Sequence, residues 1–223
     1  SGNNHHATGF NGTETYANDA IDGQQSFYFN GSTRIRYDDD ATFMESPFAH
    51  RTITMWIKPD ALSGRQMLIE SGGPVHGFAL RLNGDQLQGT VRRFLNQQNT
   101  FDMTIPNDGD WHQVGFIFDE GILTLTVDGV LGTPFDTGFP NIQMNNPPGN
   151  SGGIGGMFGG DAFGNSGLLS SDYYTGLIDN VSYHNEVLRP QQLADNFTDD
   201  GDRTGLPAGD YTVYVYDLNG CTD

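Results

Sequence analysis

The chain has 223 residues, of which 28 are acidic and 10 are basic, and its formal net charge is −18 at pH 7. This balance makes nucleic acid a poor partner, because phosphate binding needs clustered cations. Cys221 is the single cysteine, so no disulfide framework can form within the chain, and no apolar run approaches the roughly 20 residues needed to span a membrane. The 31 Gly and 10 Pro suit many short strands joined by tight turns.

The N-terminal region predicts a lead-in followed by a hairpin. Residues 1–24 are polar and rich in Gly and Asn, so we expect an irregular segment with room for one short strand. Residues 26–30 and 33–37 alternate in polarity on either side of Asn30-Gly31, a dipeptide that favours tight turns between antiparallel strands.

Two strands are predicted next. Residues 52–58 alternate with a period of two, which gives one apolar face made of Ile53, Met55 and Ile57. Trp56 lies on the opposite face, where we expect a loop to cover it. Pro59 ends this strand because it has no backbone donor for the ladder. Residues 66–70 predict a short strand.

Residues 77–91 predict the clearest hairpin. With Asn83-Gly84 as a two-residue turn, Arg81 would pair with Gln86 and Leu80 with Leu87. The alternation gives the hairpin an apolar face and a hydrogen-bonding face, and the second of these carries Arg81, Gln86, Gln88 and Arg92.

Residues 100–105 predict another short strand, and residues 108–131 predict a second hairpin, which turns at Glu120-Gly121 and is closed by Asp128-Gly129. Its apolar face consists of Val114, Phe116, Phe118, Leu123, Leu125 and Val127. On this pattern we expect Trp111 to lie in the core and His112 to be a core histidine with satisfied hydrogen bonds.

The C-terminal half begins with a region that could not pack a core of its own, because residues 134–167 are mostly Gly, Asn and Pro. Such long loops are usually functional or mobile. Residues 176–184 predict the last strand of the domain, and one helical turn is expected from Pro190 onward.

The order of five segments is more specific than any one of them: SFYFNG, TITMWIKP, DWHQVGF, LTVDG and TGLIDNVSYHNEVLRPQQL. This order resembles the laminin-G-like jellyroll domains of bacterial secreted proteins, in the concanavalin A-like lectin and glucanase group. The resemblance covers residues 1–197 and implies an all-β fold, a two-sheet antiparallel β-sandwich. Such domains often hold a structural calcium and are often attached to polysaccharide-degrading enzymes or adhesins.

The tail differs from the rest of the chain. Residues 206–223 resemble the start of a repeat module of surface proteins and gliding adhesins in the Bacteroidetes, and the acidic linker 198–205 separates them from the jellyroll. We therefore interpret the chain as part of a larger multidomain protein. The alternative is that residues 206–223 form an extra strand of the sandwich.

Asp179 is the candidate calcium ligand. It alternates with Leu177, Val181 and Tyr183, and a carboxylate beside apolar neighbours is costly unless it is paired or ligates a cation. In related jellyrolls an Asp of this late strand meets an acid and main-chain oxygens from the N-terminal region, which implies Asp22 and the turn at Asn30 here. The alternative is that Asp179 caps loop amides or pairs with an Arg.

The hydrogen-bonding face is the candidate ligand site. Arginine holds carboxylate or sulfate groups with two bonds, and glutamine can bridge neighbouring hydroxyls, which points to Arg81, Gln86, Gln88 and Arg92. An aromatic platform for sugar rings could come from Trp56, Phe163, Tyr173 or Tyr174. The alternative is that these are ordinary residues on the solvent side of an antiparallel sheet.

The same resemblance allows a test for an enzyme. Related glucanases carry a Glu-x-Asp-x-Glu strand that places nucleophile and acid on one face. No such motif occurs, and the five glutamates lie far apart in the sequence.

We therefore expect a non-catalytic carbohydrate-binding, lectin-like module with a polysaccharide or glycan as partner and a structural Ca²⁺. It would belong to a bacterial secreted or cell-surface adhesin or polysaccharide-degrading protein. The alternative is a structural or protein-protein adhesion spacer that binds no sugar, and a hydrolase or lyase comes third.

Overall fold

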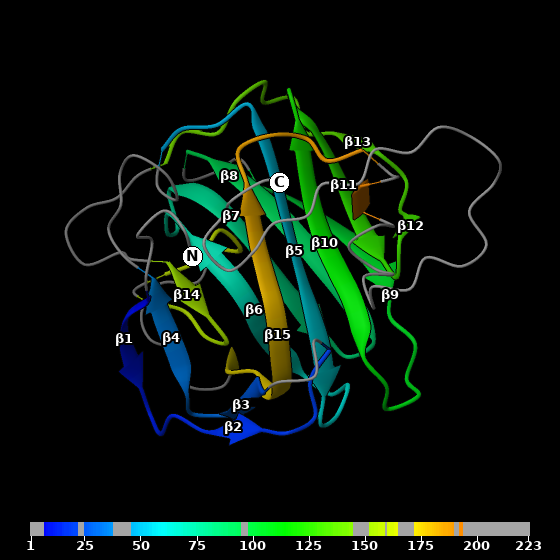
Figure 1. The fold of residues 1–223 in the computed structure, drawn as a ribbon. Helices are drawn as coiled ribbons and strands as arrows, with labels where there is room; N and C mark the ends of the chain where they lie inside the picture. Colours follow the sequence, from blue (N-terminus) through cyan, green and yellow to red (C-terminus); the bar gives the residue numbers. More distant parts are fainter. Residues whose placement is uncertain are drawn as a thin grey trace, which may run out of the picture.

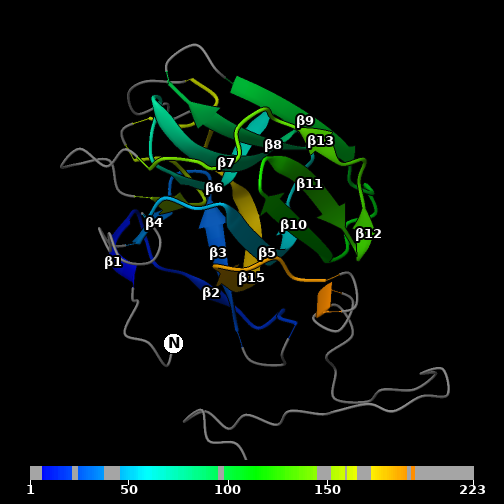
Figure 2. The same cartoon turned by 90° about the horizontal axis from the view of Figure 1, so that it is seen from above.

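The computed structural model describes residues 7–21, 25–37, 46–94, 98–144, 152–158, 160–164, 172–189 and 192–193. Within them the chain forms two antiparallel β-sheets that pack face to face, as Figures 1 and 2 show. The predicted all-β sandwich is confirmed. No helix in the described part of the chain has the length and apolar character needed to cross a membrane.

The first sheet, called sheet A, has the strand order β1 (Ala7–Asn11), β4 (Arg34–Tyr37), β14 (Gly153–Ile154), β6 (Arg65–Ser71), β7 (His76–Asn83), β8 (Gln86–Arg93) and β9 (Gln98–Thr104). The second, sheet B, has the order β12 (Val130–Leu131), β11 (Ile122–Val127), β10 (His112–Asp119), β5 (His50–Pro59), β15 (Thr175–His184), β3 (Ser26–Asn30) and β2 (Tyr16–Ala17). The short strand β13 (Phe135–Asp136) also pairs with β11.

The core fills the space between the inner faces of the two sheets. In β5, β7, β10 and β11 apolar residues recur at every second position over most of the strand, so the pleat turns one face of each strand inward. Aromatic rings interlock there: Phe48 meets Phe118 edge-on at 5.4 Å between centroids, and Phe78 lies 5.5 Å from Phe116. The predicted apolar faces of residues 52–58 and of both hairpins are therefore confirmed.

The predicted hairpin of residues 26–37 is wrong. Strand β3 belongs to sheet B and β4 to sheet A, so the turn between them carries the chain from one sheet to the other. The Oδ1 atom of Asn30 accepts hydrogen bonds from the backbone N–H groups of Ser32 and Thr33, at 3.0 and 3.1 Å, and Gly31 adopts a φ of 77°. This wider turn lets both strands turn an apolar residue toward the same core from opposite sides.

The hairpin of β7 and β8 forms, but its predicted register is wrong by two residues. Asn83 pairs with Gln86 and Arg81 with Gln88, which leaves Gly84-Asp85 as the two turn residues. Gly84 has a φ of 62°, and glycine at the first central position suits a tight hairpin turn. A slip of two residues keeps every side chain on its face, so the predicted polar face is retained.

Trp111 and His112, at the start of the second hairpin, were both predicted to lie in the core, and the prediction is confirmed only for His112. The ring nitrogens of His112 lie 2.8 Å from Asp128 and 2.9 Å from Asp108, so this buried histidine is satisfied as predicted. Burial by itself would lower the pKa of His112, but the bonds to Asp128 and Asp108 outweigh it and raise the pKa. Trp111 does not lie in the core: it is half-buried and donates its indole N–H to Asp19 at 2.8 Å.

The Gly-rich region after β11 is more than a loop. Segments 152–158 and 160–164 supply β14 and then cross the outer face of sheet A, where Ala162 and Phe163 pack on Met67 and Ala79. The buried Glu70 accepts the backbone N–H of Phe158 at 3.0 Å. This part of the region therefore forms no core of its own and packs against the sheet, which supplies the apolar partners.

The chain after β15 packs on the outer face of sheet B. Leu188 and Leu193 cover Ile117, and the N–H of Leu193 donates to the carbonyl of Arg189 at 3.0 Å. This bond closes one helical turn in the predicted place, although Pro190 lies outside the described residues. The predicted linker 198–205 and the tail 206–223 also lie outside them and stay predictions.

Candidate functional site: a pocket at the rim of the sandwich

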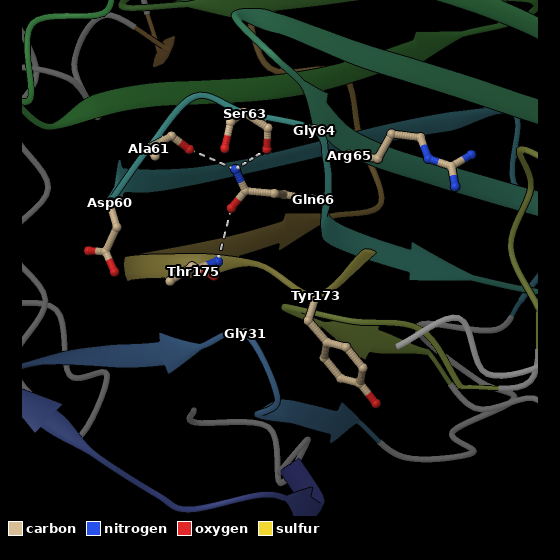
Figure 3. Close-up of a pocket in the computed structure, with 9 residues that line it drawn as sticks. All are labelled: Gly31, Asp60, Ala61, Ser63, Gly64, Arg65, Gln66, Tyr173 and Thr175. Carbon is tan, nitrogen blue, oxygen red and sulfur yellow. Dashed lines mark hydrogen bonds between the residues drawn. The ribbon is translucent and has the colours of Figure 1, made fainter. Parts of the chain in front are cut away.

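A pocket of about 370 Å³ opens at one end of the sandwich (Figure 3). Three segments that are distant in the sequence meet there: the β5–β6 loop, the turn after β3, and the residues that lead into β15. The lining residues are Gly31, Asp60, Ala61, Ser63, Gly64, Arg65, Gln66, Tyr173 and Thr175. We call this the rim pocket.

Gln66 holds the rim pocket together from its centre, as the dashed lines in Figure 3 show. Its Nε2 donates to the carbonyls of Ala61 and Ser63, at 2.8 and 3.3 Å, and its Oε1 accepts the N–H of Thr175 at 3.0 Å. The side chain is buried. One amide therefore ties the β5–β6 loop to β15, and it fixes the loop's shape.

Asp60 and Arg65 stand on opposite sides of Gln66 (Figure 3). The Oδ2 atom of Asp60 accepts the hydroxyl of Tyr28 at 2.8 Å, and this bond raises the pKa of Tyr28. The Nη2 atom of Arg65 lies 3.2 Å from Oδ1 of the buried Asp172. The side chain of Arg65 is 42% exposed, so its guanidinium is oriented by Asp172 and still reaches solvent.

Tyr173 provides the aromatic surface of the rim pocket. It is half-buried, and the guanidinium carbon of Arg34 lies 5.6 Å from its ring centroid. A Cβ on Gly156 would lie 2.8 Å from Cδ1 of Tyr173, so the absence of a side chain at position 156 makes room for the ring. The ring thus has a fixed position in the lining of the rim pocket.

The predicted hydrogen-bonding face is only partly open to a ligand. Arg81 Nε donates to Gln88 Oε1 at 2.8 Å, and Gln88 Nε2 donates to Asp102 at 2.9 Å. Phe163 lies under Arg81, whose guanidinium carbon is 3.7 Å from the ring centroid. The structure therefore brings Arg81, Gln88 and Phe163 together, but Nε of Arg81 and both polar atoms of the Gln88 amide are already hydrogen-bonded within the protein.

The other predicted ligand residues are dispersed. Gln86 lies nearer the hairpin turn and donates to Thr104 at 3.1 Å. Arg92 is 9% exposed, because Gly164 passes so close that a Cβ there would lie 2.4 Å from its Nη1. Trp56 is buried, as expected, but it faces outward from sheet B and so lies on the far side of the sandwich from Arg81. These positions exclude one joint site for all seven residues, and Tyr173 alone lines the rim pocket.

The predicted calcium ligands do not converge in the described part of the chain. Asn30 pairs with Thr175, four residues from Asp179, which corresponds to about 13 Å along a strand. Both oxygens of Asp179 accept backbone N–H groups, from Ile21 at 2.9 Å and from Asn180 at 2.8 Å. This is the alternative in which Asp179 caps loop amides. Asp22 lies outside the described residues, and within them no group of three or more His, Cys, Asp or Glu is placed to hold a metal.

A β-bulge explains why the face of Asp179 was predicted incorrectly. The pairing of β15 with β5 shifts between Asp179 and Ser182, so Val181 is exposed and Tyr183 packs against the core. Asp179 therefore does not share a face with Tyr183. A single extra residue changes the alternation, and the local sequence carries no clear signal of it.

No motif in the sequence singles out Asp60, Arg65 or Gln66. The run Pro59 to Arg65 is a polar loop between two strands, and such loops often carry function, which was the available signal. What the sequence could not show is that Gly31 and Tyr173 would meet this loop.

The fold is shared with several solved structures. The binding domain of botulinum neurotoxin serotype G superposes with a TM-score of 0.64 and 12% identity, covering 87% of this chain and 47% of that one. A second structure is that of botulinum neurotoxin type C, whose cell entry is described as dependent on interaction with two ganglioside molecules. It gives a TM-score of 0.60 and 12% identity, covering 87% of this chain and 46% of that one. The chain thus spans about half the length of these neurotoxin domains.

Domain 4 of an extracellular arabinanase from Geobacillus stearothermophilus, solved with arabinotriose, gives a TM-score of 0.59 and 21% identity, over 82% of this chain and 81% of that one. No sequence among the curated proteins matches the chain. Residues 29–194, most of its length, match the laminin G family that is described as part of the concanavalin A-like lectin/glucanases superfamily. The chain therefore belongs to this superfamily, in agreement with its two-sheet sandwich.

Proposed function

We propose that this domain is a non-catalytic carbohydrate-binding module and that the rim pocket is its sugar site. The observation that carries the proposal is the lining of that pocket, which combines the aromatic ring of Tyr173 with the carboxylate of Asp60 and the guanidinium of Arg65 on opposite sides of Gln66. A sugar ring has an apolar face that packs on an aromatic ring, and its hydroxyl groups need both donors and acceptors.

The volume of the rim pocket fits this use. Ligand pockets commonly measure about 300–1,000 Å³, and about 370 Å³ lies at the small end of that range. The pocket therefore suits one or two sugar units rather than an enclosed oligosaccharide. A longer glycan would continue out of the pocket into solvent.

A hydrolytic role is not supported by the lining of the rim pocket. Most glycosidases place two carboxyl groups across the scissile bond. Asp60 is the one acidic residue among the nine that line the pocket, and Asp172 is buried in its ion pair with Arg65. Binding without cleavage is the chemistry that these groups can perform.

The structural neighbours support the proposal in general terms. The arabinanase domain was solved with arabinotriose, and the neurotoxin type C structure concerns gangliosides. We extend the proposal to the setting expected from the sequence, a secreted or cell-surface protein in which this domain targets or anchors a larger chain.

Replacing Tyr173 tests the rim pocket. Tyr173→Ala removes the surface on which the sugar ring would stack. The sugar then loses aromatic packing and buried apolar area, so its dissociation constant should rise about tenfold or more, which corresponds to about 1.4 kcal/mol. The sugar is first identified on a glycan array that includes arabinan, other neutral polysaccharides and anionic ones. Isothermal titration calorimetry then compares the dissociation constants of the two proteins.

Phe94→Ala is the matched control, because Phe94 is 56% exposed and lies outside the rim pocket. It should leave the dissociation constant unchanged. A uniformly flat array would overturn sugar binding and favour the spacer that binds no sugar. Reducing ends or unsaturated products released from the polymer would instead overturn the non-catalytic assignment.

Calcium is a separate proposal, because the described residues do not form the predicted site. It rests on Asp179, on Asp22 and on main-chain oxygens of the N-terminal segment. If calcium is bound there, adding a chelator should lower the melting temperature measured by calorimetry, since the ion stabilises the folded state that binds it. An identical transition with and without chelator would overturn the calcium proposal. The Ile21–Asp179 hydrogen bond would then be what joins the N-terminal segment to β15.

A further inference from the structure

A second pocket, of about 190 Å³, opens on the lateral side of the sandwich between the edge strands of the two sheets. Its lining residues are Tyr16, Gln25, Phe27, Phe29, Ile35, Ile154, Ile178, Asp179, Asn180 and Val181. We call this the lateral pocket. It shares no lining residue with the rim pocket: along β3 the lateral pocket extends from Gln25 to Phe29, and the rim pocket begins at Gly31.

Aromatic rings form one wall of the lateral pocket. Phe27 stacks on Phe10, with centroids 5.7 Å apart and planes at 9°, and meets Tyr16 edge-on at 5.5 Å. Tyr16 is 51% exposed and Phe10 is 42% exposed. Side chains of this size are usually withdrawn from water, so a stacked and accessible aromatic group suits the apolar face of a ligand.

Polar side chains form the facing rim of the lateral pocket. The bulge in β15 directs Asp179 and Asn180 to this opening, and Asn180 holds a φ of 45°, which asparagine tolerates. The carboxylate of Asp179 is oriented by the N–H groups of Ile21 and Asn180, at 2.9 and 2.8 Å. Each oxygen retains capacity for a further donor, while the Asn180 amide offers a donor and an acceptor.

We propose that the lateral pocket is a second sugar-binding subsite, which takes one ring with its apolar face on Tyr16 and two hydroxyl groups on Asp179 and Asn180. The proposal rests on the carbohydrate-binding function proposed above. About 190 Å³ is below the volume of most drug-sized sites, so the pocket holds a single ring. This role of the Asp179 carboxylate, as a hydrogen-bond acceptor for the glycan, is the alternative to the calcium proposed above.

Two subsites change which glycans the domain prefers. Phe27 is the central β3 residue of the lateral pocket and lies four residues from Gly31 of the rim pocket, which corresponds to about 13 Å of strand. A polymer that reaches both pockets is held at two points, and the second contact forms at a high effective concentration. The domain therefore binds long polysaccharides more tightly than short oligosaccharides of the same sugar.

The test compares dissociation constants for a polymer and for a trisaccharide of the same sugar. One pair is the polymer with the strongest array signal and its trisaccharide. Linear arabinan and arabinotriose are the second pair. The wild-type protein should bind the polymer at least about tenfold more tightly than the trisaccharide, per binding site. Tyr16→Ala and Asn180→Gly should remove most of that difference and leave trisaccharide binding at the rim pocket. Glycine readily adopts the left-handed backbone of position 180, so Asn180→Gly removes the side-chain amide without straining the fold.

Tyr173→Ala should remove binding at the rim pocket and leave binding at the lateral pocket. The double variant with Tyr173→Ala and Tyr16→Ala should not bind the polymer. Phe94→Ala, the exposed aromatic control, should bind like the wild type. Equal polymer binding by the wild type and both lateral-pocket variants would overturn the second subsite and leave the rim pocket standing. A wild-type protein that binds no glycan would overturn the proposed function itself.

Discussion

Gly155→Ala should lower the free energy of unfolding by about 2–5 kcal/mol, which combines the cost of a left-handed alanine with overpacking of the core. Gly155 has a φ of 73°, and a Cβ there would lie 2.1 Å from two ring carbons of Phe29, which is fully buried. Neither the ring nor the backbone can move away without disturbing the core. Urea denaturation, monitored by tryptophan fluorescence, measures the change.

Gly84→Ala is the matched control for Gly155→Ala. Gly84 has a φ of 62° in the β7–β8 turn, and a Cβ on it would meet no atom within 4 Å. It should therefore show the backbone cost alone, about 1–2 kcal/mol. Equal destabilisation by the two variants would contradict the close approach of Gly155 to Phe29.

Gly155→Ala should also weaken sugar binding at the rim pocket. The carbonyl of Gly155 accepts the N–H of Tyr174 at 3.0 Å, and its own N–H donates to Leu68 at 2.9 Å. A displaced Gly155 would therefore shift the backbone next to Tyr173. This links one buried contact in the core to the position of the aromatic surface.

Gln66→Glu should have the second large effect, a loss of about 2–4 kcal/mol of stability at neutral pH together with loss of sugar binding at the rim pocket. The substitution replaces the amide group that donates to Ala61 and Ser63 by an oxygen that repels their carbonyls. The carboxylate can still accept the N–H of Thr175 in β15, but it no longer holds the β5–β6 loop to that strand. Chemical denaturation and calorimetric titration measure the two losses.

The deficit of Gln66→Glu should shrink as the pH falls. Burial and the neighbouring carbonyls raise the pKa of the introduced carboxyl group in the folded state above its value in the unfolded chain. Stability is therefore lost as the pH rises through the interval between these two pKa values, and it is regained below it, where the protonated group can donate one hydrogen bond. Gln66→Met has no such group, so its deficit should not vary over the same interval.

Several features of the fold could be predicted because they are local. Ile53, Met55 and Ile57 face the core and Trp56 faces away, as the alternation of β5 requires. The polar face of the β7–β8 hairpin survived a register error, because a slip of two residues preserves the faces. His112 could be assigned to a buried, hydrogen-bonded position for the same reason, since it continues the apolar face of its strand.

The candidate sites could be predicted only in part. Tyr173 was proposed as a sugar platform and does line the rim pocket, but its partners Asp60 and Arg65 lie more than 100 residues earlier in the chain. Asp179 was singled out for its carboxylate among apolar neighbours, yet the bulge beside it decided which groups surround it. The contacts of a side chain depend on segments that only the folded chain brings together.

The sequence by itself determined the class of fold and the inward faces of β5, β7, β8, β10 and β11, because both follow from the two-residue repeat of the extended chain and the burial of apolar groups. Only the tertiary structure decided that β3 and β4 join different sheets, that segment 160–164 covers part of the polar face, and which residues line the two pockets. These features arise from pairing between distant strands and from turns that those pairings stabilise, and no local pattern encodes them.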